Sequence, residues 1–330
     1  MRFKPIYRLV IGSSEIDVTQ NVSASTVVQI DVERNMDLFA DRCEVRLAPL
    51  GGVQPVLDDD IAIELGFDDR LFRVFTGKIS EIVPEVTTVR ILGLSPVQAL
   101  QALRVEQTYE GRTAGQIVND LAMKAKLRTG TISDGIRLLV YVIDGRLNAA
   151  RHIHRLAERC GFDAYVSPEG ALEFRSFTSA AATHVFTYGE NILDFSLTTR
   201  SARVAEVIVA GRSAASAEGD EAVSWLTKNF QAGRASGGGG TETVLIEDPA
   251  IRTTEGANLR AEGVLRRAKQ RTIIGSLRAL GRPEIKLGDA LRIEEAPDER
   301  LNQTFQVRSV RQRLNRERGL VTEIVFWGMP

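Results

Sequence analysis

The stretch LDDDIAIELGFDDRLFRVFTGKI (57–79) returns near the other end of the chain as LGDALRIEEAPDERLNQTFQVRSV (287–310). At a constant offset of 230 residues, the positions Asp59, Ile63, Glu64, Asp68, Arg70 and Leu71 match Asp289, Ile293, Glu294, Asp298, Arg300 and Leu301. After a three-residue insertion, Phe72-x-Val74 matches Phe305-x-Val307. Both regions then end alike, in VTTVRILG (86–93) and LVTEIVFWG (320–328). Matches of this number, in register, predict an internal duplication.

Both copies have the pattern of short β-strands. In residues 1–95, segments such as TVVQIDVER (26–34) and IAIELGF (61–67) alternate apolar and polar residues and are separated by turn residues. Strand patterns return from residue 183 with HVFTYG and ILDFSLTTR. Many short strands in so few residues are typical of a small barrel. We therefore expect a first tube-like β-barrel over 1–95 and a second over 183–330.

Residues 96–182 have a different pattern. TAGQIVNDLAMKAKL (113–127) has apolar residues at helical spacing and a T-x-x-Q capping box made by Thr113 and Gln116. The stretch RHIHRLAERCGFDAYVSPEGALEFRS (151–176) predicts a helix that ends at Gly161 and then a β-hairpin around a Pro-Glu-Gly turn. The predicted fold is therefore mainly β with an α+β insertion: two tube-like β-barrels that flank a small α+β module.

Two further features are expected within the second barrel. Residues 212–242 are rich in Ala, Ser and Gly, with GGGG at 237–240, which predicts a mobile loop. No Lys-Ser/Thr pair follows these glycines, so a phosphate-binding loop is not expected. Residues 253–271 predict an amphipathic helix with Leu259, Val264, Leu265 and Ala268 on its apolar side.

The composition is that of an ordinary soluble protein, with 43% hydrophobic and 26% charged residues and a net charge of −1. No apolar run approaches the ~18 residues of a membrane span. The apolar YRLVI near the N-terminus is too short for a signal-peptide core and fits a first strand better. Two cysteines make no disulfide framework, so we expect a reducing cytoplasm.

The near-zero net charge conceals an asymmetry along the chain. Residues 1–100 contain 10 Lys and Arg against 15 Asp and Glu, whereas residues 259–318 contain 15 against 8. A basic segment of this kind can bind nucleic acid, or it can meet an acidic surface on a neighbouring subunit. We favour the second interpretation, because the basic segment has almost no aromatic residues on which bases could stack.

The stretch 151–176 also contains two of the three histidines and one of the two cysteines. His152 and His154 are two residues apart, so on a helix they point about 200° apart. Cys160 is six and eight residues away from them, and the H-x-x-x-H spacing of helical zinc ligands is absent. We interpret this stretch as scaffold and Cys160 as a buried structural thiol.

Acidic residues offer a second candidate site. Asp58, Asp59 and Asp60, together with Asp68 and Asp69, suggest a calcium or paired-carboxylate site. However, Asp59 and Asp68 recur as Asp289 and Asp298 in the second copy, which favours a role in turns. No EF-hand loop, nucleophile elbow, H-E-x-x-H or G-x-G-x-x-G motif is found. We therefore expect no catalytic, cofactor-binding or metal-binding residues, and no enzyme.

Taken in order, several motifs resemble one known family: ADRCEVRLA, VFTGKI, YEGRTAGQIVNDLA, the helix and hairpin of 151–176, and GDALRIEEAPDERLNQTFQVRSVRQRL. Over essentially the whole chain they resemble phage late control protein D, the baseplate hub of contractile tails. This family is similar to the N-terminal hub part of valine-glycine-repeat spike proteins in type VI secretion. The resemblance implies a homotrimer in which two barrels per chain form a pseudo-sixfold ring between a hexameric tail tube and a trimeric spike.

Many members of that family continue into a spike, whereas this sequence ends at Trp327-Gly328-Met329-Pro330. We therefore expect the spike to be a separate protein. The resemblance implies assembly in the bacterial cytoplasm into a phage tail or injection particle, with other baseplate proteins as partners and no membrane. Two alternatives stay open: the tail-tip hub of a non-contractile tail, and a nucleic-acid-binding module that uses the basic C-terminal third.

Overall fold

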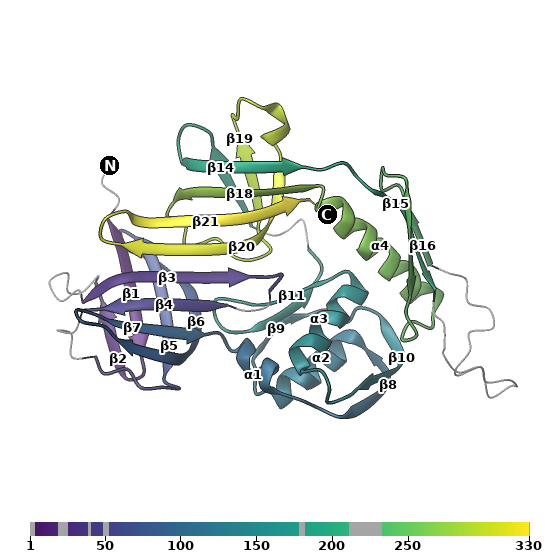
Figure 1. The fold of residues 1–330 in the computed structure, drawn as a ribbon, viewed down its shortest axis with the longest axis horizontal. Coiled ribbons are helices and arrows are strands. Elements are labelled where there is room, and N and C mark those ends of the chain that lie inside the picture. Colours follow the sequence, from purple (N-terminus) through teal and green to yellow (C-terminus); the bar gives the residue numbers. More distant parts are fainter. Residues whose placement is uncertain are drawn as a thin grey trace, which may run out of the picture.

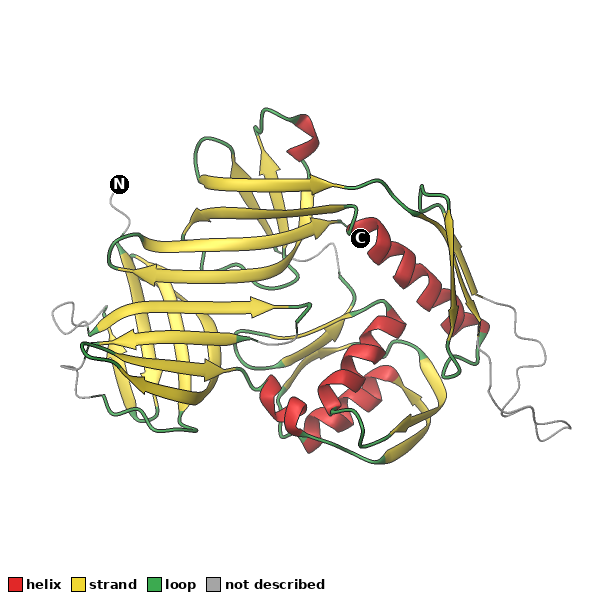
Figure 2. Ribbon diagram, in the orientation of Figure 1, coloured by secondary structure: helices red, strands yellow, loops and turns green. Residues whose placement is uncertain are grey.

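The computed structural model describes residues 4–18, 26–38, 41–48, 53–177, 182–210 and 233–329. Most of the described chain is β-strand, and the helices lie in the middle of the chain and directly before the last strands (Figure 1, Figure 2). The fold is therefore mainly β with an α+β insertion, as the sequence predicts.

The first strand region curls around one core. Its strands alternate, as a sheet with one face on a core requires: in β3, Ile30 and Val32 are buried, whereas Asp31 and Glu33 lie on the opposite face. The buried side chains of the region form a single cluster. The strands are β1 (Pro5–Ile11), β2 (Ser14–Asp17), β3 (Val27–Asn35), β4 (Arg42–Leu47), β5 (Asp60–Phe67), β6 (Arg70–Pro84) and β7 (Val89–Leu94).

The last strand region curls around a second core, in which Phe186, Phe305 and Phe326 are completely buried. Its strands are β13 (Thr183–Thr187), β14 (Ile192–Thr199), β18 (Ile273–Leu280), β19 (Ala290–Glu294), β20 (Thr304–Asn315) and β21 (Gly319–Gly328), with a short 3-10 helix, η4 (Glu299–Leu301), between β19 and β20.

One sheet runs through both regions, because β20 pairs with β3 over Ser309–Asn315. The strand order is β14-β18-β21-β20-β3-β4-β7-β6-β5-β1-β2, and β19 pairs with β13 and with the start of β20. Figure 1 shows the strands from β14 to β7 stacked in this order on one side of the molecule, with β1 and β5 behind them. The eight strands from β14 to β6 thus form a single continuous surface, which we call the common sheet.

The two strand regions repeat the same neighbours: β5-β6-β7-β4-β3 in the first corresponds to β19-β20-β21-β18-β14 in the second. The turns that precede β5 and β19 also form the same hydrogen bond in both regions. Ile79 N–H donates to Asp59 O at 2.9 Å, and Val307 N–H donates to Asp289 O at 2.9 Å. The preceding residues, Asp58 and Gly288, both have positive φ, of 67° and 81°. One departure is β13, which is parallel to β19, whereas β1 is antiparallel to β5.

β-Bulges extend the correspondence along the strands. The ladder between β6 and β7 shifts after Ile79, and the ladder between β20 and β21 shifts after Val307. The ladder between β3 and β4 shifts after Val27, and that between β14 and β18 shifts after Ile192. A bulge needs one extra residue in one strand at a fixed place. Two matching bulges therefore fix which residues of the two regions are equivalent.

The predicted register of one strand is wrong. Because Ile79 corresponds to Val307, the segment Gly77–Ile79, and not Phe72–Val74, is equivalent to Phe305–Val307. Burial agrees, since Phe72 is 37% exposed and Phe305 is fully buried. Between the shared aspartate (Asp59 or Asp289) and the bulge, the second copy is two residues shorter than the first, and not three residues longer as predicted. The Phe-x-Val pattern occurs in both strands by chance.

The middle of the chain forms an α+β unit. Thr113 caps its second helix with the predicted box, in which Thr113 Oγ1 accepts from Gln116 N–H and Gln116 Oε1 accepts from Thr113 N–H, both at 3.1 Å. The predicted hairpin is also present, with β11 antiparallel to β12. The elements are α1 (Val97–Ala102), β8 (Gln107–Thr113), α2 (Ala114–Lys124), β9 (Thr129–Ile132), β10 (Arg137–Ile143), α3 (Ala149–Cys160), β11 (Asp163–Val166) and β12 (Leu172–Arg175).

A third layer comes from a segment assigned by sequence to the second barrel. It consists of β15 (Val204–Ala210), β16 (Gly233–Ser236), β17 (Glu242–Glu247) and the helix α4 (Thr254–Gln270). Val207, Val209, Ala257 and Ala261 from this layer belong to the core of the α+β unit. That core is therefore not confined to residues 96–182.

Part of the predicted mobile loop is ordered. Residues 212–232 lie outside the described residues, but 233–236 form β16, which pairs with β15. The following glycines allow close backbone approach, since a Cβ on Gly238 would lie 2.0 Å from Val204 O. The prediction of a mobile loop for 233–242 is therefore wrong. Glycine content indicated flexibility, whereas here these residues serve close packing.

The helix predicted at 253–271 is confirmed as α4, and Leu265 is buried with Val264 packed against the same core, as predicted, but Leu259 does not face the core. Leu259 is 39% exposed, whereas Ala257, Ala261 and Gly263 are buried. Small side chains face inward because α3 lies very close: a Cβ on Gly263 would lie 2.6 Å from Gly161 Cα. Among the described residues, no helix is long and apolar enough to cross a membrane.

Candidate functional site

The histidine and cysteine stretch lies on α3, which Asn148 caps at its start and Gly161 ends with a φ of 65°. His152 is buried, with Nδ1 3.2 Å from the hydroxyl oxygen of Tyr141. His154 is half exposed, with Nε2 3.5 Å from Glu158 Oε1. The two imidazoles therefore have separate partners on different sides of the helix, as their spacing predicts.

Cys160 is also buried, and its Sγ accepts a hydrogen bond from Ile136 N–H at 3.4 Å. Burial raises the pKa of this thiol to about 11, and burial also raises the pKa of Cys43. A raised pKa disfavours the thiolate, which is the nucleophilic and metal-binding form. In the described ranges, no group of three or more His, Cys, Asp or Glu residues is placed to hold a metal ion. That the stretch is scaffold stays a prediction.

The acidic candidates lie in turns. Asp59 Oδ2 accepts from Val56 N–H at 3.3 Å, and Asp289 Oδ2 accepts from Lys286 N–H at 2.9 Å. Asp58 and Asp68 have positive φ. Asp298 caps η4, where its side chain accepts from Arg300 N–H. Asp60 and Asp69 are exposed beside these turns. The repeated aspartates thus have the turn role that the duplication suggests.

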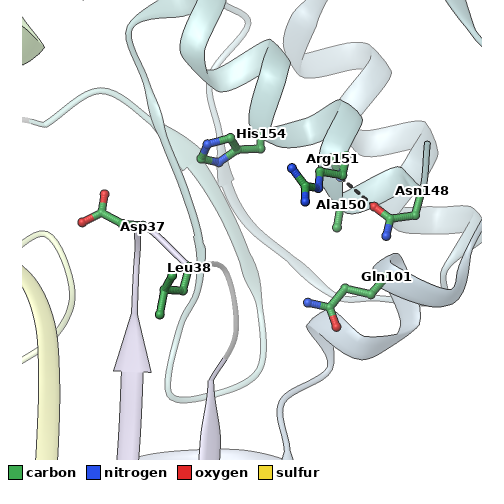
Figure 3. A pocket seen from close by; sticks show the side chains of 7 residues that line it. All are labelled: Asp37, Leu38, Gln101, Asn148, Ala150, Arg151 and His154. Atoms are coloured by element: carbon green, nitrogen blue, oxygen red, sulfur yellow. Dashed lines mark hydrogen bonds between the residues drawn. The ribbon is translucent and has the colours of Figure 1, made fainter. Parts of the chain in front are cut away.

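A pocket of about 490 Å³ lies between the end of β3 and the helices α1 and α3. Figure 3 shows His154 and Arg151 on one side and Asp37 with Leu38 on the other, and Asn148 bonded to the backbone of Arg151. The carboxylate of Asp37 also receives a hydrogen bond from the buried Arg308. The lining residues are Asp37, Leu38, Gln101, Asn148, Ala150, Arg151 and His154. They include no hydrogen-bonded pair of nucleophile and base.

Charged residues concentrate where β20 meets β3. Arg311 donates from Nε and Nη2 to the two carboxylate oxygens of Asp31, at 2.8 and 2.7 Å. Arg313 Nε donates to Asp31 Oδ2 at 3.1 Å, and its Nη1 donates to Glu323 at 3.2 Å. The basic C-terminal third therefore meets acidic residues of the first region within one chain. The expected partner was a neighbouring subunit, and for these residues that expectation is wrong.

A second charged cluster joins three parts of the molecule. Arg308 is 2% exposed and donates to Asp163 of β11 at 2.8 Å and to Asp37 at 2.5 Å. Its guanidinium carbon lies 4.4 Å from the ring centre of Trp327. Arg267 of α4 donates to the same Asp163 at 2.9 Å. The sequence does not predict this cluster, because its members lie far apart in the chain. The only related signal is the acidic excess of residues 1–100 and the basic excess of residues 259–318.

The common sheet has two strand edges without a ladder among the described residues. One is β14, which pairs only with β18. The other is the end of β6: β5 covers its outer side up to Lys78, and residues 80–84 pair only with β7. Such edges present backbone N–H and C=O groups to another chain. These two edges are the strongest candidate for a functional surface.

The overall fold is that of phage tail proteins, which confirms the predicted resemblance to baseplate hub proteins at the level of the fold. A tail protein from Neisseria meningitidis is similar with a TM-score of 0.71 and 14% identity, over 98% of this chain and 96% of that one. The 43 kDa tail protein of prophage MuSo2 from Shewanella oneidensis gives 0.68 and 13%, over 98% of both chains.

A component of the type VI secretion system of E. coli, described as structurally similar to the phage T4 tail proteins gp27 and gp5, gives a TM-score of 0.60 at 11% identity. The similarity covers 92% of this chain and 73% of that one. No known family model matches the sequence, and no curated protein sequence matches it.

Proposed function

We propose that this protein is the structural hub of the baseplate of a contractile tail or injection machine. In this proposal three copies form a ring with pseudo-sixfold symmetry, which joins a hexameric tail tube on one side to a trimeric spike on the other. The protein acts by its shape and has no catalytic role. It assembles in the bacterial cytoplasm and becomes part of the particle.

The observation that carries this proposal is the common sheet. Two equivalent strand sets lie edge to edge in one chain, so that each copy contributes two similar units to a ring. Closed assemblies repeat one interface at each step. Three copies then present six similar units, which is the arrangement needed between a sixfold and a threefold partner. The solved structures with this fold include phage tail proteins and a type VI secretion component, which supports the same role.

The direct test is the mass and shape of the purified protein. We expect native mass spectrometry to give three times the mass of one chain, and electron microscopy to show rings whose density repeats six times. A protein that is a monomer or dimer at all concentrations, and also in the presence of its tube and spike partners, contradicts the proposal.

The tail-tip hub of a non-contractile tail is the other form of this proposal, and it uses the same ring. A sheath gene next to the gene of this protein supports the contractile form, and its absence supports the other. The nucleic-acid alternative is weakened, because Arg308, Arg311 and Arg313 of the basic segment are held by carboxylates of the same chain.

A further inference from the structure

Within one chain β20 pairs with β3, but the corresponding strands of the internal repeat do not pair with each other. In the internal repeat, β6 corresponds to β20 and β14 corresponds to β3. Within the chain, β20 and β3 are paired with each other. Their counterparts β6 and β14 lie at opposite ends of the common sheet, and the edge of each is without a ladder among the described residues. We propose that β6 of one copy pairs with β14 of the next copy, antiparallel, in the way that β20 pairs with β3.

The register of this interchain junction follows from the matching bulges. Beyond the bulge that follows Ile79 and Val307, Ile82 corresponds to Val310, because each lies opposite an isoleucine of the next strand. On the other side, Leu197 corresponds to Val32, since the two occupy the same rung, opposite Gly275 and Cys43 respectively. Thr199 therefore corresponds to Arg34.

Within the chain, Val310 lies opposite Arg34, and Ser309 lies opposite Asn35. Transferring these pairs places Ile82 of one copy opposite Thr199 of the next, and Glu81 opposite Arg200. One rung further, Val83 lies opposite Thr198, and Pro84 lies opposite Leu197. Pro84 lacks an N–H donor, which fits the last position of an edge strand.

The side chains at the two edges suit this pairing. Glu81 and Arg200 are both exposed and carry opposite charges, so their juxtaposition is favourable. Ile82 packs only partly against the first core, and Leu197 and Phe195 pack only partly against the second. A strand laid along each edge would cover these apolar side chains. The contacts differ from those within the chain, where Asp31 binds two arginines.

This inference rests on the proposed ring, and site-specific cross-linking separates the two. Both native cysteines are buried, so introduced cysteines react selectively. A chain that carries Val83→Cys and Thr198→Cys should form covalent trimers on oxidation, because each junction then joins two cysteines that face each other. The matched control carries Val83→Cys and Ser276→Cys. Ser276 lies on β18, one strand inward from β14, and this pair should give little cross-linking.

Charge exchange provides a second readout. Glu81→Arg should weaken trimer formation about tenfold, and Arg200→Glu should do the same, since each creates a like-charge pair. The two changes together should restore assembly to within about threefold of the original protein. Both residues are exposed, and the pair that Glu81 forms with Arg90 in its own chain is a surface ion pair, so the single variants should change the urea midpoint only slightly.

These experiments test the junction between β6 and β14 separately from the proposed ring. A trimeric ring with efficient Val83–Thr198 cross-linking and charge rescue supports the junction. A trimeric ring in which these cysteines do not join, or in which the control pair joins equally well, overturns the junction and leaves the proposed function intact. Absence of any ring overturns the proposed function and the junction together.

Discussion

Arg311 of β20 binds both carboxylate oxygens of Asp31 of β3, with Nε and Nη2 as donors at 2.8 and 2.7 Å. The two residues are 280 positions apart in the sequence. The ion pair thus links the last strand region to the first. A forked pair of charge-assisted hydrogen bonds is stronger and more directional than a single bond.

We expect the coupling between these two residues to be measurable. A double-mutant cycle with Asp31→Asn and Arg311→Met should give an interaction energy of about 1–2 kcal/mol, since the pair is partly buried and charge-assisted. The measurement is urea unfolding of the four proteins. The exposed pair Arg300 and Asp298 serves as control and should give less than about 1 kcal/mol. Equal coupling energies for the two pairs would contradict this prediction.

Arg308 should be much more sensitive to substitution. Arg308→Met removes the cation that two carboxylates, Asp37 and Asp163, share in a buried setting. Breaking a buried ion pair by removing one partner costs about 3–5 kcal/mol. Urea unfolding should show a loss of this size. Asp163 keeps its hydrogen bond from Arg267 in this variant, so it loses one of its two cations. If Arg308→Met alone costs less than about 1 kcal/mol, the cluster does not stabilise the fold.

Gly263→Ala in α4 should destabilise the protein although alanine favours helices by about 1 kcal/mol over glycine. The added Cβ would lie 2.6 Å from Gly161 Cα, which is backbone and cannot rotate away. Overpacking of this kind typically costs about 1–3 kcal/mol. Thermal unfolding measures the effect. Glu262→Ala, on the exposed side of the same helix, is the control and should change stability by less than about 0.5 kcal/mol.

His152 should make stability depend on pH. Burial lowers the pKa of His152, so in the unfolded chain, where the pKa returns to about 6.5, this histidine binds a proton more readily. Stability from this group is present above pH 6.5 and is lost as the pH falls from there towards the lower folded pKa. The slope is at most about 1.4 kcal/mol per pH unit.

The measurement for His152 is urea unfolding between pH 5 and pH 8, compared with His152→Gln. The variant should be less stable than the original protein at pH 8 and should lose less stability on acidification. Parallel curves for the two proteins would show that His152 does not titrate in this way.

The sequence predicted the strand pattern, the α+β insertion, the capping box and the end of α3 at Gly161, because each depends on residues close together in the chain. Turn chemistry was also visible, since Asp59 and Asp289 recur. The register between the two copies could not be predicted, because a bulge and a two-residue shortening leave no local signal in the sequence. The same holds for the cluster around Arg308, whose partners are fixed only by the fold.

The apolar face of α4 shows a different limit. Periodicity placed Leu259 inward because large apolar residues usually mark the buried side. In the structure, the approach of α3 at Gly161 requires small residues there, so Ala257 and Gly263 are buried instead. Side-chain size can be interpreted only when the neighbouring element is known. The edges of β6 and β14 that have no ladder in the described part of the chain could not be predicted either, because strand pairing depends on the neighbouring strands.

The ladder between β20 and β3 has a consequence for how the chain comes apart. Seven consecutive residue pairs bridge the two strand regions, and β20 also supplies side chains to both cores, Leu314 to the first and Val310 to the second. Neither region can lose its structure without exposing the core of the other. The duplicated halves therefore form one cooperative unit, and calorimetry should record a single melting transition for both strand regions.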